Sequence, residues 1–200
     1  MKNCSLIYIL FSILFSTSLK AQLDSTYLFH DINRIHRQKI EMQVLGGWSI
    51  ANIATSLALG NSATGEDIYF NQMNVAWNVF NISIASIGYL NALKEKPSVM
   101  AMDVFQRQLK LEKSLLLNTG LDVAYIFGGL WMLERAKTFE NPKEFDRLRG
   151  FGRSLILQGS FLFLFDLSLY IIEASHASKL KEAMSLFFMR RGQLGMNISF

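Results

Sequence analysis

Polar and apolar positions between Tyr69 and Leu90 repeat with the period of an α-helix. Most positions are large and apolar, while one narrow face carries small or polar residues at spacings of three or four: Asn71, Asn74, Asn78, Asn81, Ala85 and Gly88. A helix on the surface of a soluble protein has the opposite proportions. The pattern predicts a membrane span whose polar face contacts other spans, because neighbouring helices satisfy polar side chains inside a bilayer.

Three other apolar stretches have a similar length, so four spans are expected in all, at about residues 44–59, 69–90, 115–133 and 154–172. Turn-forming residues at Asn61–Glu66 separate the first two spans, and Lys94–Pro97 end the second. We therefore expect an all-α fold, in which residues 44–174 form an integral membrane four-helix bundle of two antiparallel hairpins.

The charged connection Glu134–Arg153 is expected to contain a short helix. Asn141 and Pro142 are suited to its first turn. We expect Gly150 and Gly152 to interrupt this helix before the fourth span begins.

The two ends of the chain differ from the bundle. Residues 1–21 resemble a signal peptide with a basic start and a short apolar core, although an uncleaved first span is the alternative. Residues 22–43 are expected to form an interfacial amphipathic helix, because apolar residues recur there at helical spacing among charges of both signs. Residues 175–200 read as a polar and basic C-terminal tail.

Two rules disagree on orientation. A cleaved signal would place residue 22 outside the cytoplasm, whereas the positive-inside rule favours the reverse arrangement, because more Lys and Arg lie on that side of the predicted bundle. Both orientations stay open.

Composition supports the membrane assignment and narrows the function. Half of the 200 residues are apolar, and the net charge of +4 comes from residues spread through the connections, so we expect no nucleic-acid binding. The single cysteine, Cys4, leaves no internal disulfide. No nucleophile elbow, phosphate loop or zinc-protease motif occurs, which weakens the case for an enzyme.

Each predicted span carries a strong polar group near its middle. Asn52 lies in the first span, Asn78 and Asn81 in the second, Asp122 in the third and Asp166 in the fourth. An ionised carboxylate at the centre of a bilayer costs at least about 2.5 kcal/mol. The two aspartates are therefore expected to be neutral, to share a proton, or to be compensated by a bound cation. Further members of this polar core are Asn74, Asn118, Tyr125 and Tyr170.

Three functions are compatible with these residues. The first is a non-enzymatic membrane protein whose polar midplane supports helix packing or a membrane partner. The second is a small proton- or cation-coupled transporter or channel that uses Asp122 and Asp166. The third is a membrane enzyme or metal binder at Glu173 and His176, with His36 as a further weak candidate ligand. No cofactor is expected.

The first hairpin also resembles a known family. Gly46-Gly47-Trp48 with Asn52, and Gly65-Glu66 followed by Tyr69 to Asn78, are similar to an uncharacterised family of small multi-pass membrane proteins of Bacteroidota-type bacteria. The resemblance implies a helical protein in a bacterial membrane, most simply the inner membrane, and assigns no activity. The expected partners are the lipid bilayer and a membrane protein or a second copy of this chain.

Overall fold

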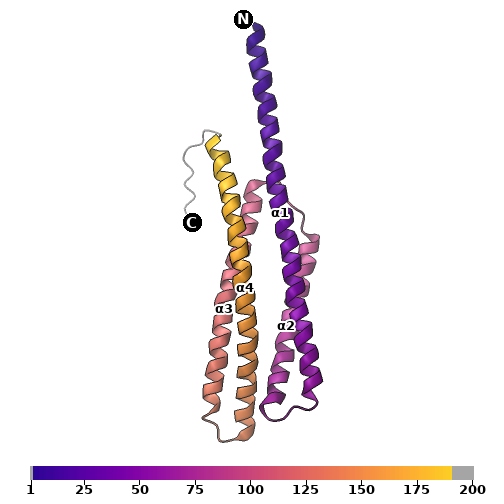
Figure 1. The fold of residues 1–200 in the computed structure, drawn as a ribbon, viewed down its shortest axis with the longest axis vertical. Coiled ribbons are helices and arrows are strands. Elements are labelled where there is room, and N and C mark those ends of the chain that lie inside the picture. Colours follow the sequence, from indigo (N-terminus) through magenta and orange to yellow (C-terminus); the bar gives the residue numbers. More distant parts are fainter. Residues whose placement is uncertain (1, 191–200) are drawn as a thin grey trace.

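The computed structural model describes residues 2–190, apart from the side chains of residues 2–23, 183 and 186–190. Four helices follow one another: α1 (Lys2–Gly60), α2 (Glu66–Lys94), α3 (Ala101–Ala136) and α4 (Pro142–Arg190). They form two antiparallel hairpins, α1–α2 and α3–α4, which lie side by side along the long axis of the molecule (Figure 1). The described chain contains no strand, and the expected all-α fold is confirmed.

Local sequence explains where α2 begins and ends. Gly65 precedes the helix with φ of 56°, a conformation that glycine adopts without steric cost. Glu66 and Asp67 occupy the first turn and Lys94 the last, so each charge complements the helix dipole. The buried residues of α2 are Asn71, Asn74, Asn78, Asn81, Ala85 and Ala92, which confirms that the narrow polar face is the inner one.

One boundary expected from the sequence is absent. Helix α4 continues without a break through Gly150 and Gly152 to Arg190, so the expectation that these glycines interrupt it is wrong. Glycine destabilises a helix by about 1 kcal/mol relative to alanine, and tertiary contacts offset that cost. Residues 22–43 are helical and continue directly into the predicted first span as part of α1.

Cleavage of the signal at residues 1–21 stays a prediction, and so does any contact of residues 22–43 with a bilayer surface. Residues 175–190 of the predicted tail belong to α4, and the remainder of the tail lies outside the described residues.

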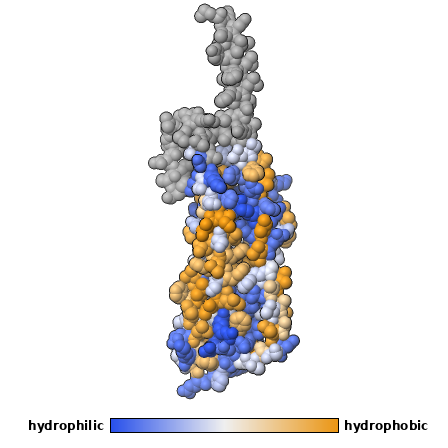
Figure 2. Space-filling view, in the orientation of Figure 1, coloured by the Kyte–Doolittle hydropathy of each residue, from blue (hydrophilic) through white to orange (hydrophobic). Residues whose placement is uncertain are grey.

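In the middle of the bundle, polar and apolar side chains are distributed in the opposite way to those of a soluble protein. Apolar side chains that include Val79, Phe80, Leu117 and Phe127 are exposed. The residues buried there are mostly polar, although Leu45, Ala85 and Leu115 are buried among them. The polar ones are Ser49, Ser56, Asn71, Asn74, Asn78, Asn81, Thr119, Asp122, Ser154, Gln158 and Asp166. Figure 2 shows the result on one face as an apolar belt across the middle, with hydrophilic residues gathered above and below it.

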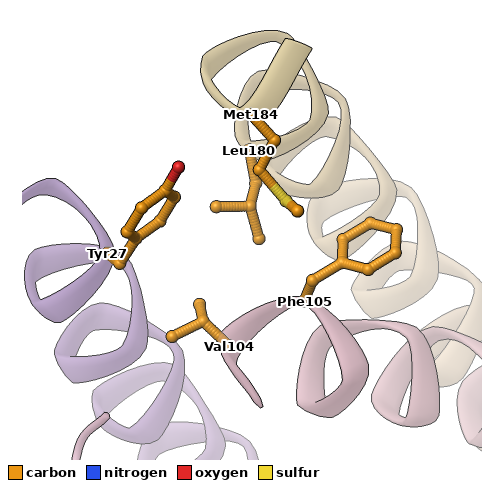
Figure 3. Close-up of a cluster of buried hydrophobic side chains, with 5 residues drawn as sticks. All are labelled: Tyr27, Val104, Phe105, Leu180 and Met184. Atoms are coloured by element: carbon orange, nitrogen blue, oxygen red, sulfur yellow. The ribbon is translucent and has the colours of Figure 1, made fainter. Parts of the chain in front are cut away.

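The end of the bundle that holds the start of α3 has ordinary polarity. Tyr27 of α1, Val104 and Phe105 of α3, and Leu180 and Met184 of α4 form a buried apolar cluster (Figure 3). The helices therefore extend past the apolar belt and pack there like those of a soluble bundle.

Below this cluster, ion pairs join α1 to the α2–α3 connection. Buried Arg34 pairs with Asp31 and with Glu95, and Arg107 also contacts both acids. The backbone N–H of Ser98 donates to Asp31 at 2.8 Å. These contacts fix the connection against α1.

Of the four expected spans, two lie in helices that are long and apolar enough to cross a membrane. Within the described residues these helices are Ala101–Ala136 and Pro142–Glu182. Only 22% of the most apolar window of each is buried, whereas a core helix of a soluble protein would be mostly buried.

Candidate functional site

One polar network joins α1, α2 and α4 in the half of the bundle near the α1–α2 turn. The Nδ2 group of Asn74 donates to Ser56 Oγ at 2.8 Å and to Asn52 Oδ1 at 3.1 Å. Gln158 Nε2 donates to Asn74 Oδ1, and also to Asn52 Oδ1 at 3.3 Å. Trp48 Nε1 donates to Gln158 Oε1 at 3.0 Å. The network satisfies both ends of the Gln158 amide, and its geometry is that of inter-helix packing.

Gln158 was missed by the sequence reasoning, although it is fully buried and joins the two hairpins. A usable signal existed, because Ser154, Gln158, Asp166 and Glu173 lie on one side of α4 and all are buried. Trp48 lies over the same helix, with its ring stacked on Phe161 at 3.8 Å between centroids. Trp48 is therefore half-buried against α4.

The second polar layer contains the two aspartates predicted from the sequence. Asp122 of α3 and Asp166 of α4 are both buried, and both line one cavity. Two carboxylates that share a site repel each other, so a proton or a cation between them is favoured. The structure thus brings together the pair on which the proton or cation hypothesis depends.

A cavity of about 570 Å³ opens beside this pair, mainly between α2 and α3. Its acidic lining residues are Glu41, Glu95, Asp122 and Asp166, and no Lys, Arg or His is among the described residues that line it. The cavity also receives Asn81, Asn118 and Tyr125, so five of the predicted polar-core residues lie around one space.

Several buried polar atoms around the cavity lack a hydrogen-bond partner. Within the described residues they include Asp122 Oδ2, Asn81 Nδ2 and the indole Nε1 of Trp77. Buried polar groups are nearly always paired, and leaving one unpaired costs about 1–3 kcal/mol. All three side chains line the cavity, so a molecule bound there is a candidate partner for their unpaired atoms.

The other predicted residues have more local roles. Asn78 is fully buried and its Nδ2 donates to Asn74 O at 2.8 Å on the same helix. Tyr125 packs edge-on against Trp77, with ring centroids 4.8 Å apart. Tyr170 is half-buried on α4, one turn from Asp166.

Glu173 participates in an ion pair rather than in a cluster of metal ligands. Arg37 Nη2 donates to Glu173 Oε2 at 2.9 Å, its Nε donates to Oε1, and Gln108 Nε2 also donates to Oε2 at 2.9 Å. Burial alone would raise the pKa of Glu173, but the hydrogen bonds from Arg37 and Gln108 outweigh it and lower that pKa. No group of three or more potential metal ligands occurs among the described residues; His176 contacts Ile172 O at 2.7 Å, and His36 is exposed.

Glu41 shows the opposite behaviour at the upper edge of the cavity. Burial, followed by the nearby Glu173 carboxylate, raises the pKa of Glu41 from 4.5 to about 7, although Arg37 acts against the shift. Asp166 adds a smaller repulsion. The region around Glu41 thus favours a compensating positive charge.

Comparison with known proteins now gives the family. A model of the Family of unknown function (DUF6992) matches residues 44–167, more than half of the chain. The chain belongs to this family. The resemblance to an uncharacterised family is confirmed, while the membrane nature and the bacterial source stay predictions. The matched segment contains the Gln158 network and both cavity aspartates. No curated protein and no solved structure matches the chain.

Proposed function

We propose that the protein is a non-enzymatic, multi-pass integral membrane protein whose inner cavity binds a proton or cation at Asp122 and Asp166. The four spans would be those at about residues 44–59, 69–90, 115–133 and 154–172, in a bacterial inner membrane. The observation that carries the proposal is the polar interior within an apolar exterior. Such an arrangement is unfavourable in water and favourable in lipid.

The same reasoning applies to α1 and α2, whose average hydropathy is lower. The asparagines of α2 reduce its average, yet four of them face inward while Val79, Phe80, Ile84 and Ile87 are exposed. An average over all positions ignores which face is polar. When the exposed and buried faces of each helix are considered separately, four spans are supported, whereas mean hydropathy alone supports two.

The two polar layers have different roles in this proposal. The Gln158 network is internally satisfied and supports helix packing. The Asp122–Asp166 layer faces a cavity and has an unpartnered acceptor oxygen, which favours binding. Buried carboxyl groups inside a membrane mark proton and ion pathways in many transporters, so a small coupled transporter or channel is the activity that this layer favours.

Cysteine labelling tests the membrane arrangement. In a Cys4→Ser background, single cysteines at Ser62 and Thr138 would lie at one end of the bundle and one at Lys96 at the other. In intact cells, a membrane-impermeant maleimide should either label positions 62 and 138 and leave position 96 unlabelled, or label only position 96. Equal labelling of all three in intact and lysed cells would contradict the four spans. The pattern also fixes the orientation.

Thermal stability of the detergent-purified protein tests the binding layer. Acid or sodium should stabilise the parent chain, and the Asp122→Asn plus Asp166→Asn variant should lose that response. The matched control is Asp67→Asn plus Asp146→Asn at the far end of the bundle, which should keep it. If the parent and the Asp122/Asp166 variant respond alike and are equally stable, the second layer serves packing only, and the search turns to a membrane partner or homo-oligomer.

A further inference from the structure

The size of the cavity argues for an organic ligand. Its volume of about 570 Å³ falls within the range of small-molecule sites, about 300–1,000 Å³, and far exceeds the roughly 30 Å³ of one water molecule. A bare metal ion would fill only a small part of it. The lining is partly apolar, as in sites for carbon-containing ligands: Phe165 and the outward-exposed Phe80 and Leu121 lie beside the polar groups.

The charges of the lining select a cationic ligand. Glu95 is already paired with Arg34 and Arg107, so its charge is compensated from outside the cavity. Arg37 lies near Glu41 from outside the lining, where it also pairs with Glu173. Asp122 and Asp166 have no basic side chain beside them among the described residues that line the cavity. A phosphate-bearing lipid headgroup is disfavoured for the same reason, because nothing in this lining would neutralise its anion.

The unpartnered atoms describe the hydrogen bonds that the ligand must make. Asp122 Oδ2 is an acceptor on a side chain that is 3% exposed, and Asn81 Nδ2 is a donor on a side chain that is 4% exposed. Trp77 Nε1 is a second donor on the same helix as Asn81. The ligand therefore needs an N–H group for the carboxylate and an oxygen for the amide or the indole. The faces of Trp77 and Tyr125 can also stabilise a nearby cation.

We propose that this cavity binds a protonated organic amine that also carries a hydrogen-bonding oxygen. The ammonium group contacts Asp122 and Asp166, while the oxygen accepts from Asn81 or Trp77. This inference rests on the proposed cation site at the two aspartates, and it names the class of ligand for that site.

The test uses the full chain in detergent and a matched set of probes. The main probe is 2-amino-1-phenylethanol, which combines an ammonium, a hydroxyl and one aromatic ring. The neutral diol 1-phenyl-1,2-ethanediol lacks the charge, 2-phenylethylamine lacks the hydroxyl, and sodium chloride supplies an inorganic cation. Calorimetric titration gives the affinity of each probe, and the shift of the melting temperature gives a second readout.

The amino alcohol should bind best and raise the melting temperature, while the diol should do neither. Asp122→Asn should lower the affinity for the amino alcohol by about tenfold or more, as expected for loss of a charged hydrogen bond. In Asn81→Ala, the affinity for the amino alcohol should fall to the affinity of the parent chain for 2-phenylethylamine. The control Asn71→Ala changes another buried asparagine of α2 that does not line the cavity, and it should leave binding unchanged.

Three outcomes would overturn the inference. If sodium or acid stabilises the protein through the aspartates and no amine binds, the ligand class is wrong while the proposed cation site stands. If no probe, acid or sodium acts through Asp122 and Asp166, both proposals fail. If the amine binds equally to the parent and to Asp122→Asn, its site lies elsewhere on the protein.

Discussion

Gly129 of α3 and Gly152 of α4 face each other where the two helices cross. A Cβ added to either residue would lie 2.7 Å from the carbonyl oxygen of the other. This reciprocal geometry places the two backbones in direct contact. Small residues permit such close crossings, and the packing of α3 on α4 depends on this one.

Alanine at this crossing should destabilise the protein. The atoms nearest to an added methyl group at Gly152 are the carbonyl oxygen of Gly129 and side-chain carbons of Leu133 and Met132, so the helices must separate. We expect Gly152→Ala to cost about 1–3 kcal/mol, the usual range for overpacking. Denaturant or thermal unfolding in detergent measures the change.

The neighbouring Gly128 supplies the control. Nothing lies within 4 Å of a Cβ built there. Because alanine is the better helix former, Gly128→Ala should be neutral or up to about 1 kcal/mol stabilising. Equal effects of the two substitutions would show that the crossing does not determine stability.

Gln158→Leu should weaken the contact between the hairpins. The change leaves Trp48 Nε1 without a partner, and Asn74 Oδ1 keeps only the 3.4 Å hydrogen bond from Asn78 Nδ2. We expect a loss of about 1–2 kcal/mol, near the upper values measured for hydrogen bonds between membrane helices. Gln72→Leu makes the same chemical change at an exposed position of α2 and should alter stability by less than about 0.5 kcal/mol. A loss at Gln72 as large as that at Gln158 would count against the network.

Arg37→Met should be among the most damaging changes outside the apolar belt. It leaves the fully buried Glu173 carboxylate without its cation, which typically costs about 3–5 kcal/mol. Adding Glu173→Gln removes the buried charge, so the double variant should recover part of the loss. Equilibrium unfolding of both single variants and of the double variant gives the coupling energy. If the effects of the two single substitutions simply add in the double variant, Arg37 and Glu173 do not stabilise each other.

Glu41 should make stability fall as pH rises from about 4.5 to about 7. Its folded pKa is raised from 4.5 to about 7, so the folded state holds the extra proton in that interval. The contribution is present at low pH and is lost as pH rises through the folded value, with a slope of at most about 1.4 kcal/mol per unit.

Glu41→Gln should flatten this part of the profile. Glu134→Gln, at an exposed side chain, should leave the profile as in the parent. Melting temperatures at half-unit pH steps compare the three proteins, and an unchanged slope in Glu41→Gln would show that another group titrates.

Periodicity alone determined the helical class and the inner face of α2. A side chain every 100° around a helix is a local property, so Asn71, Asn74, Asn78 and Asn81 could be placed on one face without knowing what they contact. The turn before Glu66 and the end of α2 at Lys94 also depend on nearby residues only.

Tertiary structure decided which neighbours those faces meet. Gly150 and Gly152 have the same local signature as helix breakers, and only the approach of other backbones shows that they are contact points. Gln158 pairs with residues 84 and 110 positions away, and Arg37 with one 136 positions away. The cavity beside Asp122 exists because α2 and α3 stand apart there, a distance set by the packing of both hairpins and not by the residues of either helix.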